Sequence, residues 1–217
     1  MSVTLVIECS TPQATVALVD GDGVTQREFT SDRNHNAMLF EPLQELIPER
    51  KDIERVLVGS GPGSYSGTRV GIAAAQGIGL ALGCPVIALP SILAVSAADE
   101  GKCCLAIGDA RRGSYWTAKI AGNTMEHEPQ LCELDGLKEI LSASGADVTV
   151  FAFEPAEQFP VEELQPKIEL QHPDATRLWR TWQQSSEEQQ AAWQAEIAQP
   201  IYLKPPHITP GKRARLI

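Results

Sequence analysis

Two carboxylates occupy positions from which they could perform chemistry. Glu8 lies near the end of the apolar run Val3–Cys9, and Asp109 follows the apolar run Cys103–Ile107. If both runs are strands that end at a common cleft, the two side chains could orient a hydrated Mg²⁺ ion, which prefers carboxylate and water oxygens. The alternative, which we favour from the residue types, is that both are ordinary turn and cap residues.

A glycine-rich loop, Gly59–Gly67, precedes a helical pattern that begins near Thr68. Such a loop can bind an anion, because free backbone N–H groups and the helix dipole are directed at one point. The loop lacks the Gly-Lys-Ser/Thr of a Walker sequence, and it does not follow the strict dinucleotide fingerprint. A tight strand-to-helix connection is the simpler interpretation, and both stay open.

The histidines do not suggest a metal site. His35, His127, His172 and His207 are far apart, and none stands in the H-x-x-x-H spacing that places two imidazoles on one helix face. We therefore expect neither a metal nor any other cofactor in this chain.

Composition points to an acidic globular protein. The 217 residues carry a formal net charge of -10, with 43% hydrophobic residues. The negative field repels phosphate backbones and anionic membrane surfaces, so direct binding of nucleic acid or membrane is not expected. Five cysteines form no C-x-x-C pair, and residues 1–9 lack a basic leader. Both features favour a cytoplasmic protein.

The elements expected to hold these residues follow the order of a ribonuclease-H-like lobe, β-β-β-α-β-α-β. Apolar periodicity and turn residues predict them in this order: strands at Val3–Cys9, Thr15–Val19 and Val24–Phe29, a helix at Asn34–Ile47 ending at Pro48, a strand at Arg55–Val58, a helix at Thr68–Leu82 and a strand at Val86–Leu89.

A second copy of this opening is expected from Cys103, which predicts two lobes, residues 1–100 and a smaller 101–217. Its expected elements are strands at Cys103–Ile107, Tyr115–Ile120 and Val148–Phe153, and helices at Leu134–Leu141 and Ala175–Gln194. Trp179, Trp182 and Trp193 could anchor one face of the last helix. An extended tail is expected over residues 200–210, where prolines interrupt any period.

The helix after the glycine-rich loop has no water-facing side. Gly67, Gly71, Ala75, Gly79 and Gly83 recur every four residues and form a smooth row, and the other faces are almost wholly apolar. A soluble helix that is apolar all round must be covered all round, whereas a sheet covers one face. The helix at 34–47 could cover the second face, but we favour a partner chain packed on the small-residue row.

The partner interface predicted on the two helices is the following set: His35, Met38, Leu39, Pro42, Leu43, Leu46, Thr68, Gly71, Ile72, Ala75 and Gly79.

Four segments together resemble the TsaB (YeaZ) family: Leu5–Thr11, Gly61–Gly71, Asp109–Tyr115 and Pro200–Lys204. The resemblance covers nearly the whole chain in order, and the string Gly-Pro-Gly-Ser-Tyr-Ser-Gly-Thr-Arg-Val-Gly is highly specific. The residues that match the family pattern are Ser10, Thr11, Gly61, Pro62, Gly63, Ser64, Gly67, Arg69, Asp109 and Arg111.

The resemblance implies an actin-like (ribonuclease-H-like) α/β fold with two lobes and mixed sheets flanked by helices. It also implies a non-catalytic subunit that supports the catalytic paralogue TsaD and the ATPase TsaE in placing threonylcarbamoyl on the adenosine beside the tRNA anticodon. Contact with tRNA would then occur only through the complex. Without its partner the chain is expected to form a weak homodimer.

Departures from the family pattern reduce the case for chemistry in this chain. Glu8-Cys9-Ser10-Thr11 replaces the usual Asp-Thr-Ser-Thr, and Ser114 replaces a glutamate. Where the catalytic paralogue carries two metal-binding histidines, this chain has Ser91 and Val95. The alternatives are a self-sufficient actin-like kinase, for which residues 121–217 lack an adenosine-binding glycine sequence, and an M22-type metallopeptidase, which lacks its ligands.

Overall fold

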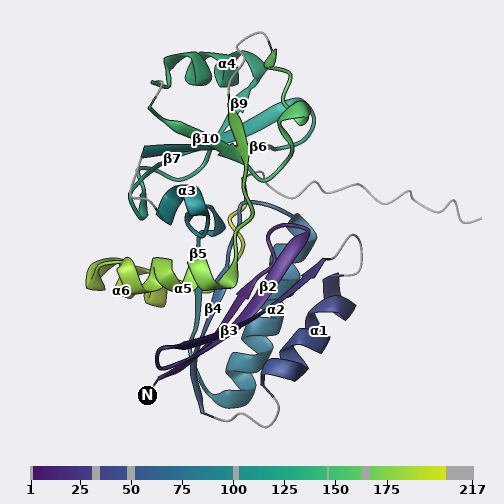
Figure 1. Cartoon of the computed structure of the whole chain (residues 1–217), viewed down its shortest axis with the longest axis vertical. Helices are drawn as coiled ribbons and strands as arrows, with labels where there is room; N and C mark the ends of the chain where they lie inside the picture. Colours follow the sequence, from purple (N-terminus) through teal and green to yellow (C-terminus); the bar gives the residue numbers. More distant parts are fainter. Residues whose placement is uncertain are drawn as a thin grey trace, which may run out of the picture.

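The computed structural model describes residues 2–30, 35–47, 52–99, 103–145, 147–162 and 167–203. They form two lobes, each built on one mixed sheet with helices against it, as expected for the actin-like class (Figure 1). The expected helix cap Asn34, the stop at Pro48 and the tail beyond Leu203 lie outside the described residues.

The first sheet has the strand order β3-β2-β1-β4-β5. The first three strands form an antiparallel meander, and β4 and β5 lie parallel to β1. The predicted strands are confirmed, each within a few residues of the expected bounds: β1 (Val3–Glu8), β2 (Gln13–Asp20), β3 (Gly23–Thr30), β4 (Ile53–Gly59) and β5 (Val86–Leu89).

Two helices cover one face of this sheet, as Figure 1 shows: α1 (His35–Leu46) and α2 (Tyr65–Leu82). Helix α2 begins three residues before the predicted start, because the Ser64 side chain caps it by accepting a hydrogen bond from the Gly67 N–H at 3.2 Å. It ends at Gly83, whose φ of 70° suits the left-handed conformation of a helix C-cap.

The predicted helix at Ala175–Gln194 is two helices, which corrects the expectation. Helix α5 (Ala175–Gln184) ends at Ser185, and α6 (Glu187–Ala195) begins with Ser186 as its cap. Two consecutive serines favour such a break, because their hydroxyls bond to backbone groups and compete with helix hydrogen bonds. The predicted aromatic anchor is confirmed: Trp182 and Trp193 are buried, with ring centroids 6.4 Å apart.

Both of these helices pack on the first sheet, opposite α1 and α2 (Figure 1). The Ala175 N–H donates to the Thr15 hydroxyl at 2.8 Å, and the Ile201 N–H donates to the Ser60 carbonyl at 2.9 Å. The chain therefore returns to the first lobe near residue 171. Helices α5 and α6 and Ile201 lie against the first lobe, although the expected boundaries, 1–100 and 101–217, assign them to the second.

The second sheet has the order β11-β10-β6-β7-β8, with β9 beside β7. Strands β6 and β7 repeat the antiparallel opening of the first lobe, and β10 lies parallel to β6. The second lobe contains the following strands and helices in chain order: β6 (Cys103–Asp109), β7 (Ser114–Ala121), β8 (Thr124–Met125), β9 (Gln130–Glu133), α4 (Leu134–Ala143), β10 (Thr149–Ala152), η2 (Ala156–Gln158) and β11 (Ile168–Leu170).

One hydrophobic cluster is common to both lobes, in addition to one cluster within each lobe. The short helices η1 (Ser91–Leu93) and α3 (Ser96–Asp99) connect the sheets. Ile92 and Leu93 are buried in a cluster that contains side chains of both sheets and of α5, including Leu57, Phe151 and Trp182. Among the described residues, no helix combines the length and apolar character needed to span a membrane.

The row of small residues on α2 faces this chain's own sheet, which corrects the predicted partner groove. A β-carbon on Gly71 would lie 3.3 Å from the Cys9 β-carbon, and Ala75 is fully buried. A β-carbon on Gly79 would collide with Val86 and lie 3.0 Å from the Cys84 carbonyl oxygen. The small residues therefore let α2 approach β1 and β5 closely.

We predict opposite effects from two alanine substitutions on α2. Gly79→Ala should destabilise the chain by about 1–3 kcal/mol through overpacking, offset by about 1 kcal/mol of helix propensity. Gly77→Ala should stabilise it by about 0.5–1 kcal/mol, because a β-carbon there meets no atom within 4 Å. Urea unfolding of both variants measures the difference. A Gly79→Ala variant as stable as Gly77→Ala would contradict the close approach of α2 to β5.

Candidate functional site

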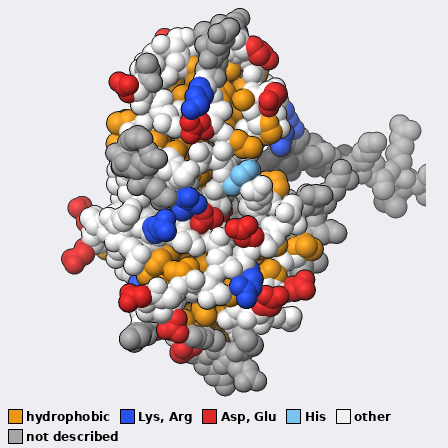
Figure 2. All heavy atoms as spheres, viewed as in Figure 1, with side chains coloured by type: hydrophobic (Ala, Val, Ile, Leu, Met, Phe, Trp, Pro, Cys, Tyr) orange, Lys and Arg blue, Asp and Glu red, His pale blue; other side chains and the backbone are white. Residues whose placement is uncertain are grey.

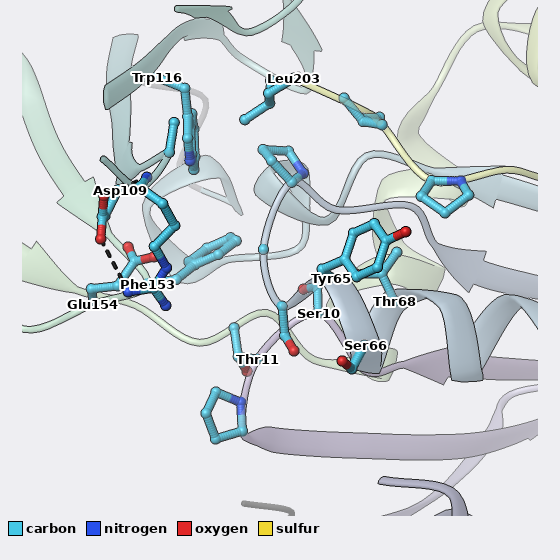
Figure 3. A pocket seen from close by; sticks show the side chains of 18 of the residues that line it. Ser10, Thr11, Tyr65, Ser66, Thr68, Asp109, Trp116, Phe153, Glu154 and Leu203 are labelled. Carbon is cyan, nitrogen blue, oxygen red and sulfur yellow. Dashed lines mark hydrogen bonds and ion pairs between the residues drawn. The ribbon is translucent and has the colours of Figure 1, made fainter. Parts of the chain in front are cut away.

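Residues of both lobes surround a cleft of about 600 Å³ (Figure 3). One wall belongs to the first lobe and consists largely of hydroxyl groups, including Ser10, Thr11 and Ser66. The other belongs to the second lobe and carries Asp109 and Glu154. Most residues that carry the family pattern therefore meet at one place.

The loop before α2 is held against β1 by backbone hydrogen bonds. The Ser64 N–H donates to the Ser10 carbonyl at 2.6 Å, and the Gly61 N–H donates to the Ser91 hydroxyl at 3.0 Å. Gly63 is required here, because a β-carbon at this position would collide with the Ser10 carbonyl oxygen. The loop thus places Ser10 beside the first turn of α2.

Glu8 does not face the cleft, so the structure does not bring it together with Asp109 as a pair of metal ligands. Its side chain is fully buried, and its Oε1 accepts a hydrogen bond from the Ser10 N–H at 2.7 Å. Burial raises the pKa of this carboxyl, and the hydrogen bonds from Ser10 and Ser91 offset the shift in part. Glu8 supports the turn that follows β1.

Asp109 organises the hairpin between β6 and β7. Its carboxylate accepts hydrogen bonds from the Arg111 backbone N–H at 2.7 Å and from the Arg111 guanidinium at 3.1 Å. Arg111 and Arg112 both adopt left-handed backbone conformations, with φ of 67° and 60°. This conformation is costly for residues other than glycine, and the bonds to Asp109 help to offset the cost.

Glu154 is a charged residue of the cleft that the sequence interpretation missed. It follows β10, which pairs in parallel with β6, so its side chain lies beside Asp109 at the same edge of the sheet. The carboxyl ends of neighbouring parallel strands were the signal that could have identified it. Burial, followed by the negative charge of Asp109, raises the pKa of Glu154 to about 7.

The predicted family-pattern residues fall into three groups. Those that line the cleft are Ser10, Thr11, Pro62, Gly63, Ser64, Asp109 and Arg111. Gly61 and Gly67 are buried beneath it. Arg69 does not line the cleft but the groove between α1 and α2, and its guanidinium donates to the Tyr65 hydroxyl at 2.6 Å.

A second hollow, an apolar groove of about 1010 Å³, lies between α1 and α2. Its lining comes from α1 and the residue that follows it, Phe40, Leu43, Gln44 and Ile47, and from α2, Arg69, Val70, Ala73, Ala74, Gly77 and Ile78. Phe40 is 56% exposed, and a β-carbon at Gly77 would meet only open space. In the described part of the chain, no other element covers this outer face of α2.

Few of the residues predicted as a partner interface lie on that outer face. Met38 is exposed and Leu43 lines the groove, but the rest with described side chains are buried within the chain: Leu39, Pro42, Leu46, Thr68, Gly71, Ile72, Ala75 and Gly79. The side chain of His35 lies outside the described part. The prediction therefore named mainly residues of the buried face of α2, not of its outer face.

Comparison with known proteins decides the family. The family model described as "TsaD: tRNA N6-adenosine threonylcarbamoyltransferase" matches residues 25–160, more than half of the chain. The tRNA threonylcarbamoyladenosine biosynthesis protein TsaB of Escherichia coli is 31% identical over 122 residues, and that of Bacillus subtilis is 29% identical over 120. This chain belongs to the TsaB (YeaZ) family.

The whole fold is shared with a solved structure, YeaZ from Pseudomonas aeruginosa. The match has a TM-score of 0.70 at 20% identity and covers 94% of this chain and all of that one. The sequence matches are shorter and cover 52% of this chain for both the E. coli and the B. subtilis protein. The chain spans about half the length of these curated relatives, 52% of each. At 20% identity the structural match establishes the fold only.

The surface of the described residues is mixed in charge. Figure 2 shows acidic and basic side chains interspersed over both lobes on the face viewed, without a continuous basic area among the coloured atoms. The described part of the chain also contains no group of three or more His, Cys, Asp or Glu residues placed to hold a metal ion.

We predict that Glu154 makes stability pH-dependent near neutrality. Its folded-state pKa of about 7 lies above the ordinary value of 4.5, so the folded state binds the proton more tightly, and stability falls as pH rises through this interval. Glu154→Gln removes this loss. Its melting temperature relative to that of the native chain should therefore increase from about pH 5 to about pH 8.

Glu157→Gln is the matched control, because Glu157 is an exposed carboxylate three residues away that does not line the cleft. Thermal unfolding at a series of pH values measures both variants. A constant difference between Glu154→Gln and the native chain over this range would show that Glu154 is not desolvated.

Proposed function

We propose that this chain is a non-catalytic subunit of the machinery that installs threonylcarbamoyl on the adenosine beside the tRNA anticodon. Membership of the TsaB family supports the process, since relatives of this chain carry that process in their names. One structural observation supports the role as a subunit: the groove between α1 and α2 is open and apolar on a chain of net charge -10. Apolar hollows of this size on soluble proteins commonly bind a partner.

The partner that we propose for the groove is the catalytic paralogue TsaD. A paralogue of the same fold offers helices equivalent to α1 and α2, and a helix fits a groove between two helices by packing its side chains between theirs. Ala73, Ala74 and Gly77 keep the floor of the groove low, so a partner helix could approach closely. Arg69 at the margin provides a charge that fixes the orientation.

The remaining parts of the proposal concern what this chain does not do by itself. The positions equivalent to the histidines of the paralogue are Ser91 and Val95, and both are fully buried. Turnover would then belong to TsaD, with TsaE as the ATPase, and this chain would hold no cofactor. Contact with tRNA would arise in the complex, in the cytoplasm and without membrane contact.

A charge in the groove should break the complex and leave the fold intact. Ala73→Glu places a carboxylate on an exposed position of the groove. If the groove binds TsaD, the carboxylate becomes buried without a partner, and affinity should fall roughly a hundredfold or more. Calorimetry with purified TsaD measures the affinity, and threonylcarbamoylation of tRNA by the reconstituted proteins measures the consequence.

Leu131→Glu is the matched control. Leu131 is 43% exposed and lies on β9 of the second lobe, far in sequence from the residues that line the groove. It introduces the same charge and should leave both binding and modification unchanged. Equal loss in both variants would argue that net charge, not the groove, governs assembly. Full activity of Ala73→Glu would exclude the groove as the TsaD site.

Without TsaD the same groove should make the chain self-associate weakly. Two copies related by a two-fold axis would cover each other's exposed Phe40 and Met38. Sedimentation at high micromolar concentration should show a monomer–dimer equilibrium that Ala73→Glu shifts to monomer. A strictly monomeric mass for the native chain would contradict this prediction.

A further inference from the structure

The cleft between the lobes contains three buried polar atoms that have no hydrogen-bond partner in the described part of the chain. They are Oε2 of Glu154, Oγ1 of Thr68 and Oγ of Ser10. All three residues line the cleft, Glu154 from the second lobe, Thr68 from the first turn of α2 and Ser10 from the turn after β1 (Figure 3). Thr68 is only 3% exposed. Such atoms are rare in native proteins, so three of them in the walls of one cavity indicate that a ligand supplies the missing bonds.

The wall around Glu154 selects a positively charged group. Arg111 pairs with Asp109 at 3.1 Å, and its side chain is 80% exposed. When Glu154 is ionised, the carboxylates of Asp109 and Glu154 and the guanidinium of Arg111 sum to one negative charge on this wall. The buried rings of Trp116 and Phe153 line the same wall. An apolar wall weakens the screening of charge, and aromatic rings attract cations.

The opposite wall selects a neutral polar group. Thr68, Ser64 and Ser66 present hydroxyls at the beginning of α2. A hydroxyl both donates and accepts, so a ligand hydroxyl suits the unpartnered Oγ1 of Thr68. A volume of about 600 Å³ is within the usual range for small-molecule sites.

We propose that the cleft binds a small organic cation, an amine that also carries a hydroxyl group. Its ammonium group donates to Oε2 of Glu154, and its hydroxyl pairs with Oγ1 of Thr68. A bare divalent cation is the competing occupant, but it takes six or more oxygen ligands, and this wall offers two carboxylates, one already paired with Arg111.

Linear amino alcohols from aminoethanol to aminohexanol are the probes, each compared with the diol of the same length, which differs only by replacement of the ammonium group. At about pH 8, where Glu154 is mostly ionised, at least one amino alcohol should bind saturably at millimolar concentration, and its diol should not. Calorimetry at constant ionic strength measures this. Failure of the whole series to bind, or equal binding of the diols, overturns the proposal.

Two variants and one control test the contacts. Glu154→Gln should weaken binding at least tenfold, because a hydrogen bond from a charged group is lost, whereas Thr68→Val should weaken it roughly two- to tenfold. Glu157→Gln removes an exposed charge nearby and should have no effect. Equal weakening by Glu157→Gln would show non-specific attraction to an acidic protein. Competition by sub-millimolar Mg²⁺ in the native chain, abolished by Glu154→Gln, would assign the cleft to a metal instead.

The native chain supplies a readout that does not depend on the folding of any variant. Of its four tryptophans, Trp116 lines the cleft, while Trp179, Trp182 and Trp193 belong to α5 and α6. In an NMR titration the bound amino alcohol should shift the indole N–H signal of Trp116 and leave the other three in place. Shifts of the α5 and α6 indoles without a shift of Trp116 would place the ligand elsewhere and overturn the proposal.

Discussion

The close packing of α2 on its own sheet is the constraint on which the rest of the structure depends. Gly71, Ala75 and Gly79 carry little or no side chain, so the helix lies directly against β1 and β5. This contact fixes the position of the helix beginning at Tyr65, and with it one wall of the cleft. It also determines which side of α2 remains outside. The helix is apolar all round, so packing of its small side leaves a second apolar side, with Val70 and Ala73, exposed beside α1.

The two hollows of the molecule follow from this geometry, and they differ in chemistry. The groove between α1 and α2 is apolar and open, which suits another protein chain. The cleft between the lobes is lined by hydroxyls on one side and by Asp109 and Glu154 on the other, which suits a small polar molecule. Helix α2 contributes to both, the groove through its outer face and the cleft through its first turn. A ligand in the cleft and a partner in the groove would therefore contact the same rigid element.

The second lobe is attached to this frame by a shared core rather than by a flexible link. Ile92 and Leu93 pack between the sheets, and α5 returns from the second lobe to cover the first. The Ala175 N–H donates to Thr15, on a strand 160 residues earlier in the chain. Buried side chains from segments distant in sequence thus join the second lobe to the first.

Local patterns in the sequence determined the elements and the class of fold. Alternating and apolar runs predicted the strands of the first lobe and β6, β7 and β10 of the second within a few residues, but not the short strands β8, β9 and β11. The uniformly apolar stretch before Gly83 predicted a helix that must be covered on all sides. Only tertiary structure decided which side of α2 meets the sheet, because helical periodicity groups residues by face but does not say what each face contacts. The sequence likewise did not show that Glu154 lies beside Asp109, since 45 residues separate them in the chain. The parallel alignment of β10 with β6 brings these two carboxylates together.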